Sequence, residues 1–138
     1  MLVLDTNVYL DASIDAELAV RIAGFIEESG EQVGLSSVVL GELLVGVRPR
    51  ERERLLGWVT GGIPDKAIVT PTHADWMAAG DVLQRLGGST ATKGRSFWND
   101  LLIATSCARA GATLLTRNMD DFRRIRRFTS LNVTSRPD

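Results

Sequence analysis

Three acidic residues occupy positions from which their carboxylates could act together, namely Asp5, Glu42 and Asp100. Asp5 follows the short apolar run Leu2–Leu4, which predicts a buried strand. Glu42 lies in a helical segment, 38–47, that is apolar almost throughout, so its charge needs a cation, an arginine or an open cleft beside it. Asp100 shares a helical face with apolar residues one turn further along, so we expect its carboxylate to point inward.

Each of the three acids also has a simpler structural interpretation. Asp5 could be a turn residue that bonds the backbone near Asn7. Glu42 could lie on the one solvent-facing stripe of its helix. Asp100, if it lies in the first turn of a helix, could be favoured there by the helix dipole alone.

Three inward carboxylates at one edge of a fold would repel one another unless a cation lay among them. Oxygen ligands without a cluster of His or Cys favour Mg²⁺ or Mn²⁺ over zinc. The one histidine, His73, suits the start of a helix, where Thr72 and Asp75 form a capping-box pattern. A divalent ion held by carboxylates can deprotonate water and neutralise charge on phosphoryl oxygens, so the chemistry indicated is phosphodiester hydrolysis.

The elements that must position these acids alternate between short apolar runs and longer amphipathic segments. The apolar runs predict strands at Leu2–Leu4, Val33–Leu35, Ala67–Val69, Thr113–Thr116 and Leu131–Val133. The amphipathic segments predict helices at Leu18–Ser29, Val38–Arg48 (capped by Ser36 or Ser37), Arg50–Trp58, Thr72–Leu86, Phe97–Ala110 (capped by Ser96) and beyond Asn118, which could cap the last helix. We expect a turn and loop after Asp5, and the greatest flexibility between Gly87 and Arg95.

This alternation predicts a three-layer α/β/α fold with a central, mostly parallel sheet. The 138 residues, of which 44% are apolar, suit a single domain that spans 1–138. In such sheets ligands bind beyond the carboxyl ends of the strands, which is where Asp5 and Asn118 fall.

The composition excludes several classes of function. A net charge of -1 argues against a general polyanion binder, although arginines cluster at 48–54 and 123–127, where they could bind phosphates or simply form solvated helix faces. The single cysteine, Cys107, suits a buried apolar position. The three tryptophans are more typical of core residues than of base-stacking platforms: Trp58, Trp76 and Trp98.

The N-terminal residues show no basic region followed by an apolar stretch of the kind that directs export. No apolar run approaches the roughly 18 residues of a membrane span. We therefore expect a cytoplasmic protein that does not contact membranes.

Several short motifs together resemble the PIN-domain family, and in particular the VapC-like toxins of bacterial toxin–antitoxin pairs. They are Leu4–Asn7, Ser36 with Gly41–Leu43, Asn99–Ala104 and Thr116–Asn118. The resemblance covers nearly the whole chain in the family's order. It implies a metal-dependent endoribonuclease in which Asp5, Glu42 and Asp100 ligate Mg²⁺ or Mn²⁺ and water attacks RNA. It also implies a homodimer and an antitoxin partner that covers the acidic groove, often with an inserted arginine.

The family often carries a fourth acid directly after its Thr-Arg pair, where this chain has Asn118. The resemblance implies that Asn118 contributes to catalysis and that Asp121, or else Asp120, restores the missing charge as a metal ligand. Asn118 and Asp121 also form a helix-cap pattern, which is the simpler interpretation of Asp121.

Other residues are expected to support the site. Side chains expected to orient the carboxylates are Thr6, Asn7 and Thr116. Residues expected to contact RNA are Arg117, Arg95 and Lys93.

Two other functions fit parts of the pattern. A PIN-like scaffold that lost activity through Asn118 would bind RNA or a protein without cleaving it. A phosphatase of the haloacid-dehalogenase type also places an aspartate after its first strand, but it requires a second aspartate where this chain has Asn7, and a catalytic lysine, for which only Lys66 and Lys93 are present.

Overall fold

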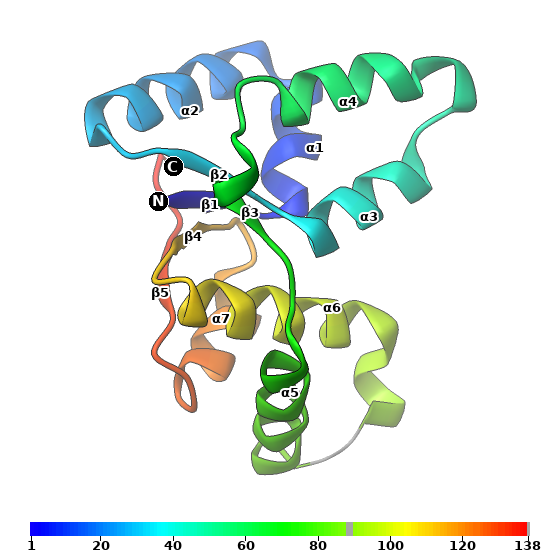
Figure 1. The fold of residues 1–138 in the computed structure, drawn as a ribbon, viewed down its shortest axis with the longest axis vertical. Coiled ribbons are helices and arrows are strands. Elements are labelled where there is room, and N and C mark those ends of the chain that lie inside the picture. Colours follow the sequence, from blue (N-terminus) through cyan, green and yellow to red (C-terminus); the bar gives the residue numbers. More distant parts are fainter. Residues whose placement is uncertain (88–89, 138) are drawn as a thin grey trace.

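The computed structural model describes residues 1–87 and 90–137, with only the backbone described from 90 to 95. Five strands form one sheet in the order β3-β2-β1-β4-β5, and all neighbouring pairs are parallel (Figure 1). The strands are β1 (Leu2–Leu4), β2 (Val33–Ser36), β3 (Ile68–Val69), β4 (Thr113–Leu115) and β5 (Asn132–Thr134). The predicted parallel sheet is therefore confirmed.

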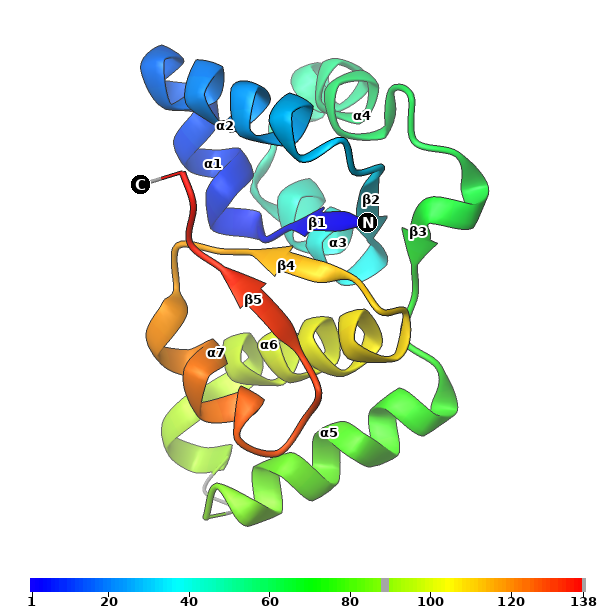
Figure 2. The same cartoon turned by 90° about the vertical axis from the view of Figure 1, so that its left-hand side faces the viewer.

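Helices cover both faces of the sheet (Figures 1 and 2). One layer holds α1 (Thr6–Ile14), α2 (Ala16–Ser29), α3 (Ser37–Gly46) and α4 (Arg52–Thr60). The other layer holds α5 (His73–Arg85), α6 (Thr90–Arg109) and α7 (Met119–Arg126). Short 3₁₀ helices, η1 (Pro49–Glu51) and η2 (Asp65–Ala67), precede α4 and β3. The three-layer α/β/α architecture predicted from the sequence is confirmed.

The centre of the sheet is β1, which pairs with β2 on one side and with β4 on the other. Its three residues are buried, and the Asp5 N–H continues the ladder by donating to the Leu115 carbonyl at 2.8 Å. The helix α6 packs on the sheet through fully buried residues that include Ile103, Ala104 and Cys107. Parallel β1, β2 and β4 therefore bring the residues after their carboxyl ends to one edge.

The expected turn and loop after Asp5 are wrong, because α1 begins directly at Thr6. Asp5 has an extended backbone and occupies the N-cap position, where its Oδ1 accepts the Thr6 N–H at 2.8 Å. Asp15 then caps α2 by accepting the Leu18 N–H at 3.0 Å. Two consecutive N-capped helices thus stand where the sequence predicted a loop and one helix.

The helix predicted to begin at Phe97 begins instead at Thr90, so Ser96 lies inside α6 and does not cap it. Residues 90–95 include Gly94 and two threonines, which are weak helix formers, and this composition suggested a loop. The greatest flexibility was predicted between Gly87 and Arg95. Residues 88 and 89 and the side chains of 90–95 lie outside the described residues, so this prediction is not tested there. Asp100 is now a mid-helix residue, which removes the helix-dipole interpretation.

The tryptophans are less buried than the sequence indicated. Trp58 is 50% exposed and Trp76 is 54% exposed, so their assignment to the core is wrong. Each contacts one aromatic neighbour: the rings of Tyr9 and Trp58 are nearly perpendicular with centroids 5.6 Å apart, and the tilted rings of Trp76 and Trp98 have centroids 6.2 Å apart. The helices that carry them are surface layers, so half of each indole remains open.

The helix α3 is also less enclosed than its apolar sequence suggested. Val39 and Leu43 are buried, but Val45 is 90% exposed. The predicted cap is confirmed, since the Ser36 hydroxyl accepts the Val39 N–H. Among the described residues, no helix is long and apolar enough to cross a membrane.

Candidate active site

Asp5 is the central acid of the candidate site. The strand β1 and the start of α1 hold it, and it is 4% exposed. Its second oxygen, Oδ2, accepts a hydrogen bond of 2.7 Å from the Thr116 hydroxyl at the end of β4. Burial raises the pKa of the Asp5 carboxyl and the charge of Glu42 adds to this rise, while the hydrogen bonds from Thr116 and Thr6 oppose it. As the turn interpretation expected, the Asp5 side chain bonds a nearby backbone N–H, but it does so as the N-cap of α1.

Glu42 joins the site through Thr6. The Thr6 hydroxyl donates to Glu42 Oε1 at 2.8 Å, while the Thr6 backbone N–H donates to Asp5. Thr6 therefore orients both carboxylates, that of Asp5 at the end of β1 and that of Glu42 on α3. Glu42 is half-buried, so it does not occupy a fully solvated stripe.

Asp100 points inward from the middle of α6 and is 9% exposed. Burial raises the pKa of the Asp100 carboxyl to about 8, and the charges of Asp5, Glu42 and Asp121 add to that rise in this order. The four acids come from the end of β1 and from α3, α6 and α7, and the other three are close enough to Asp100 to raise its pKa. The fold thus brings together Asp5, Glu42 and Asp100, and with them Asp121, the residue expected to supply the missing fourth charge.

Asp121 enters the site from the first turn of α7. Asn118 occupies the N-cap position of this helix, but its side chain makes no cap bond and instead donates to Asp121 Oδ2 at 3.3 Å. The Asn118 backbone N–H donates to the Thr116 hydroxyl at 3.0 Å, which ties the loop to the residue that holds Asp5. Asn118 therefore occupies the N-cap position that the sequence predicted, but its side chain does not accept a backbone N–H of the helix.

Asn7 and Arg117 connect α1 to the loop after β4. Asn7 Oδ1 accepts the Arg117 N–H at 3.3 Å, so the contact shown for Asn7 orients this loop rather than a carboxylate. The Arg117 guanidinium pairs with Asp11 at 2.8 Å. The side chains of Arg95 and Lys93, the other residues predicted to contact RNA, lie outside the described residues.

The donor set fits a hard divalent cation, because its ligands are carboxylate oxygens held by hydroxyl and amide donors. Among the described residues, no three acidic, His or Cys side chains lie close enough to hold one ion in the arrangement seen. Burial is the main cause of the raised pKa of Asp100, and repulsion from the neighbouring acids adds to it; a cation between the acids would offset that repulsion. The chemistry of the residues fits Mg²⁺ or Mn²⁺, and binding requires the side chains to close inward.

One further residue borders the acids, and the sequence did not single it out. Arg124, one turn after Asp121 on α7, forms an ion pair with that carboxylate at 3.7 Å. Its guanidinium also lies 5.9 Å from the centre of the Phe97 ring on α6. The sequence showed Arg124 only as one of a run of arginines, although its i,i+3 spacing from Asp121 was a usable signal.

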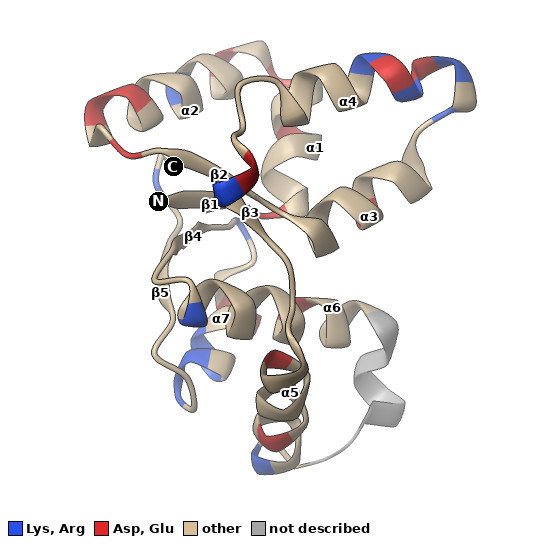
Figure 3. Ribbon diagram, in the orientation of Figure 1, with Lys and Arg blue, Asp and Glu red and all other residues tan. Residues whose placement is uncertain are grey.

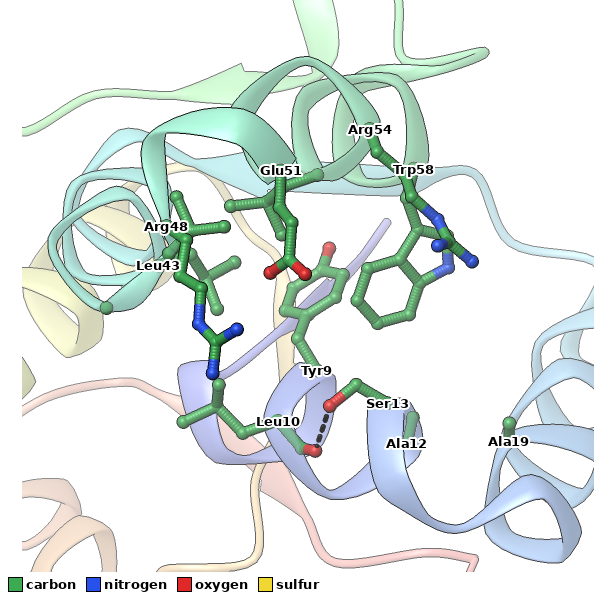
Figure 4. Close-up of a pocket in the computed structure, with 13 residues that line it drawn as sticks. Tyr9, Leu10, Ala12, Ser13, Ala19, Leu43, Arg48, Glu51, Arg54 and Trp58 are labelled. Atoms are coloured by element: carbon green, nitrogen blue, oxygen red, sulfur yellow. Dashed lines mark hydrogen bonds between the residues drawn. The ribbon is translucent and has the colours of Figure 1, made fainter.

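Away from the acids, an open groove of about 680 Å³ runs between α1, α3 and α4 (Figure 4). Tyr9 and Trp58 contribute aromatic rings to it, and Leu10 contributes a half-exposed apolar side chain. Figure 4 shows Arg48 and Arg54 on either side of Glu51, with Arg54 beside Trp58. A second hollow of about 530 Å³ shares Tyr9 and Trp58 and continues along α2.

The family model of the PIN domain matches residues 2–128. The chain belongs to the PIN-domain family. The match spans β1 through α7 and so includes all four acids of the site.

Solved structures share the fold of this PIN domain at low sequence identity. VapBC from Salmonella typhimurium, bound to DNA, aligns with a TM-score of 0.71 and 22% identity over 96% of each chain. VapBC2 from Rickettsia felis, bound to a DNA fragment from its promoter, gives 0.68 and 21% over 96% of each chain. FitAB bound to the IR36 DNA fragment gives 0.66 and 18% over 97% of this chain and 94% of that one. No curated protein matches the sequence of this PIN domain significantly.

Proposed function

We propose that this PIN domain is a divalent-metal-dependent endoribonuclease that acts as the toxin of a toxin–antitoxin pair. The observation that carries the proposal is the convergence of Asp5, Glu42 and Asp121 around the buried Asp100, whose pKa is raised to about 8 by burial first and then by the charges of the other three acids. A site that gathers acids at the cost of mutual repulsion suits a cation, whereas a polyanion binder without metal would gain nothing from it.

The four acids would hold Mg²⁺ or Mn²⁺, directly or through water. When bound, such an ion supplies an activated water and neutralises charge on the phosphoryl oxygens. Thr6 and Thr116 keep the carboxylates of Asp5 and Glu42 oriented. Asn118 keeps Asp121 turned toward the others, and it takes the place of the acid that the family often carries there.

The partner proposal rests on the structural neighbours, which are the two-component assemblies VapBC and FitAB. We infer an antitoxin that lays an apolar segment in the groove over Tyr9 and Trp58 and offers carboxylates to Arg48 and Arg54. Pairing with a second copy of the chain stays a prediction of the resemblance.

The function is tested by incubating antitoxin-free protein with a panel of structured and single-stranded RNAs, with Mg²⁺, Mn²⁺ or EDTA. The key variant is Asp5→Asn, because asparagine also caps helices well and so preserves the start of α1 while it removes the charge. The matched control is Asp65→Asn, at an exposed position in η2.

We expect discrete metal-dependent products from the parent and from Asp65→Asn, and a loss of at least about 100-fold in rate from Asp5→Asn, since a metal ligand is removed. Cleavage that persists undiminished in EDTA or in Asp5→Asn would overturn the proposal. RNA binding without any cleavage would instead favour the scaffold function.

The phosphatase alternative lacks support in the structure. Its mechanism needs a second acid at position 7, where Asn7 bonds the Arg117 backbone. Lys66 is exposed in η2 and is no part of the acidic set. A search for phosphorylated Asp5 after a single turnover would expose that mechanism.

A further inference from the structure

Arg124 is the basic side chain that the described structure ties directly to the acidic site. It lies on α7 one turn after Asp121 and is 40% exposed along its side chain. It reaches over Phe97, which lies one turn before Asp100 on α6. The guanidinium therefore borders the site through Asp121 and lies near the turn of α6 that precedes Asp100.

The other arginines near this edge have different positions. Arg117 is paired with Asp11 at 2.8 Å. Arg123 lies near Asp120 at 3.9 Å, and both side chains are largely exposed. Figure 3 shows that α7 carries a concentration of basic residues on the side of the sheet where α6 lies. Within this group, Arg124 is the member whose ion-pair partner is itself one of the four acids.

An acidic site poses a problem for an RNA substrate, because its carboxylates repel phosphates. A bound metal neutralises part of that charge at the scissile phosphate, but the neighbouring phosphates still need a cation. Arginine suits this role because its planar fork binds two phosphate oxygens at once.

We propose that Arg124 binds a phosphate of the RNA backbone beside the scissile bond, exchanging its ion pair with Asp121 for the phosphodiester. This inference rests on the proposed ribonuclease function and names the residue that anchors its substrate. Because the contact is to phosphate, Arg124 contributes affinity for any RNA sequence and does not select bases.

The geometry permits this exchange. The Asp121 pair is long at 3.7 Å and half-exposed, so water screens it and it is weak. The stacking over Phe97 does not depend on Asp121, and it keeps the guanidinium near the site when the pair opens.

The test measures RNA binding by fluorescence anisotropy, with a labelled mixed-sequence single-stranded RNA and Mg²⁺. All proteins carry Asp100→Asn, so that the RNA is not cut. Arg124→Gln is compared with the matched variant Arg126→Gln, an exposed arginine of the same helix. Both substitutions lie on the surface of α7, and circular dichroism checks that each variant folds.

We expect Arg124→Gln to weaken binding roughly 5- to 20-fold, equally for two unrelated RNA sequences, and to lower the salt-dependence slope by about 0.7, the value for one lost phosphate contact to single-stranded nucleic acid. Arg126→Gln should change affinity no more than about twofold. Equal effects of the two variants would overturn the proposal.

A structural role through Asp121 is separated by a double-mutant cycle. In an Asp121→Asn background the ion pair is gone, so a residue that only neutralises Asp121 has no further effect on RNA binding. We expect Arg124→Gln to weaken binding and lower the salt slope in this background as well. Loss of both effects there would make Arg124 a partner of Asp121 alone and would overturn the proposal.

The two proposals fail in distinguishable ways. If the parent cleaves RNA with Mg²⁺ but Arg124→Gln binds like the parent, the role of Arg124 is refuted and the nuclease stands. If the parent never cleaves RNA, the nuclease function is refuted, and the proposed role of Arg124 beside a scissile bond is refuted with it.

Discussion

Asp100 occupies an unusual environment for an acid, since it lies mid-helix, nearly buried, and faces three other carboxylates. Neither a helix dipole nor solvent compensates its charge in that position. Such a residue destabilises the protein that contains it whenever it is ionised without a cation. In the proposed nuclease, a bound metal ion would offset this cost to the metal-free fold.

The pH dependence of the metal-free protein follows from the raised pKa of Asp100, about 8 against an ordinary value of 3.8. Because the folded state binds this proton more tightly than the unfolded state, stability falls as pH rises between these two values. Asp100→Asn removes the ionisation. We expect it to raise the free energy of unfolding in EDTA by roughly 1–3 kcal/mol near pH 8, and by less near pH 5.

Urea unfolding at the two pH values measures this gain. Asp65→Asn is the control, since an exposed acid should leave both values within about 0.5 kcal/mol of the parent. A destabilised Asp100→Asn at pH 8 would mean that the carboxylate has a stabilising partner in the metal-free fold.

At the level of single residues, the sequence predicts what is chemically exceptional and misses what depends on proximity. Glu42 and Asp100 stood out because apolar neighbours surround them. The bridging role of Thr6 emerges only when α1 and α3 are placed side by side. Arg124 looks like any other member of an arginine run until Phe97 and Asp121 lie beside it.

At the scale of the elements, an ion pair between Asp75 on α5 and Arg109 on α6 joins these two helices, and α6 is the helix that carries Asp100. Asp75 is 3% exposed, and both its oxygens accept from Arg109 Nε, at 3.1 and 2.9 Å. Arg109 also donates to the Thr70 carbonyl at 3.1 Å, and Asp75 completes the capping box with Thr72. Burial opposes the charge of Asp75, but the hydrogen bonds from Thr72 and Arg109 outweigh it and lower the pKa.

We expect Asp75→Asn to destabilise the protein by roughly 1–3 kcal/mol near neutral pH, because Arg109 loses its buried partner. A lowered pKa means that this stability is present above the ordinary value of 3.8 and is lost as pH falls through the folded value. Thermal unfolding of Asp75→Asn and of Asp81→Asn, an exposed acid of the same helix, measures the difference. Equal effects of the two changes would show that the pair contributes nothing.

The strands were predicted to within a residue or two, because short apolar runs bounded by polar residues leave few alternatives. Helix starts were less reliable. The start of α1 was hidden because a strand-ending aspartate and an N-cap aspartate are the same residue, Asp5. The exposure of α3 at Val45, and of Trp58 and Trp76, could not be predicted from the sequence. An apolar residue alone does not show whether the protein's own core or a partner covers it.

On the scale of the whole molecule, the acids and the aromatic groove are separate surfaces that share α1. Thr6 at one end of this helix contacts Glu42, while Tyr9, Leu10 and Ser13 line the groove. A partner bound in the groove would therefore rest against the same helix that orients the carboxylates.

If the proposed antitoxin binds in the groove, Leu10→Asp should weaken its co-purification after co-expression at least about tenfold, since the substitution places a charge in an apolar contact. Ile14→Asp is the matched control, because Ile14 is 86% exposed on the same helix and lies outside the groove. Quantitative pull-down with both variants measures the effect. If Ile14→Asp disrupts the complex and Leu10→Asp does not, the partner lies on another face of α1.

The strand order β3-β2-β1-β4-β5 has a consequence for the timing of synthesis. Asp5 and Glu42 are made early, but the hydroxyl that holds Asp5 belongs to Thr116, and Asp121 follows it. The ribosome must therefore release β4 and α7 before the four acids can meet. In the proposed nuclease, the four acids would therefore come together only after α7 has been synthesised, so a shorter nascent chain would lack the complete site.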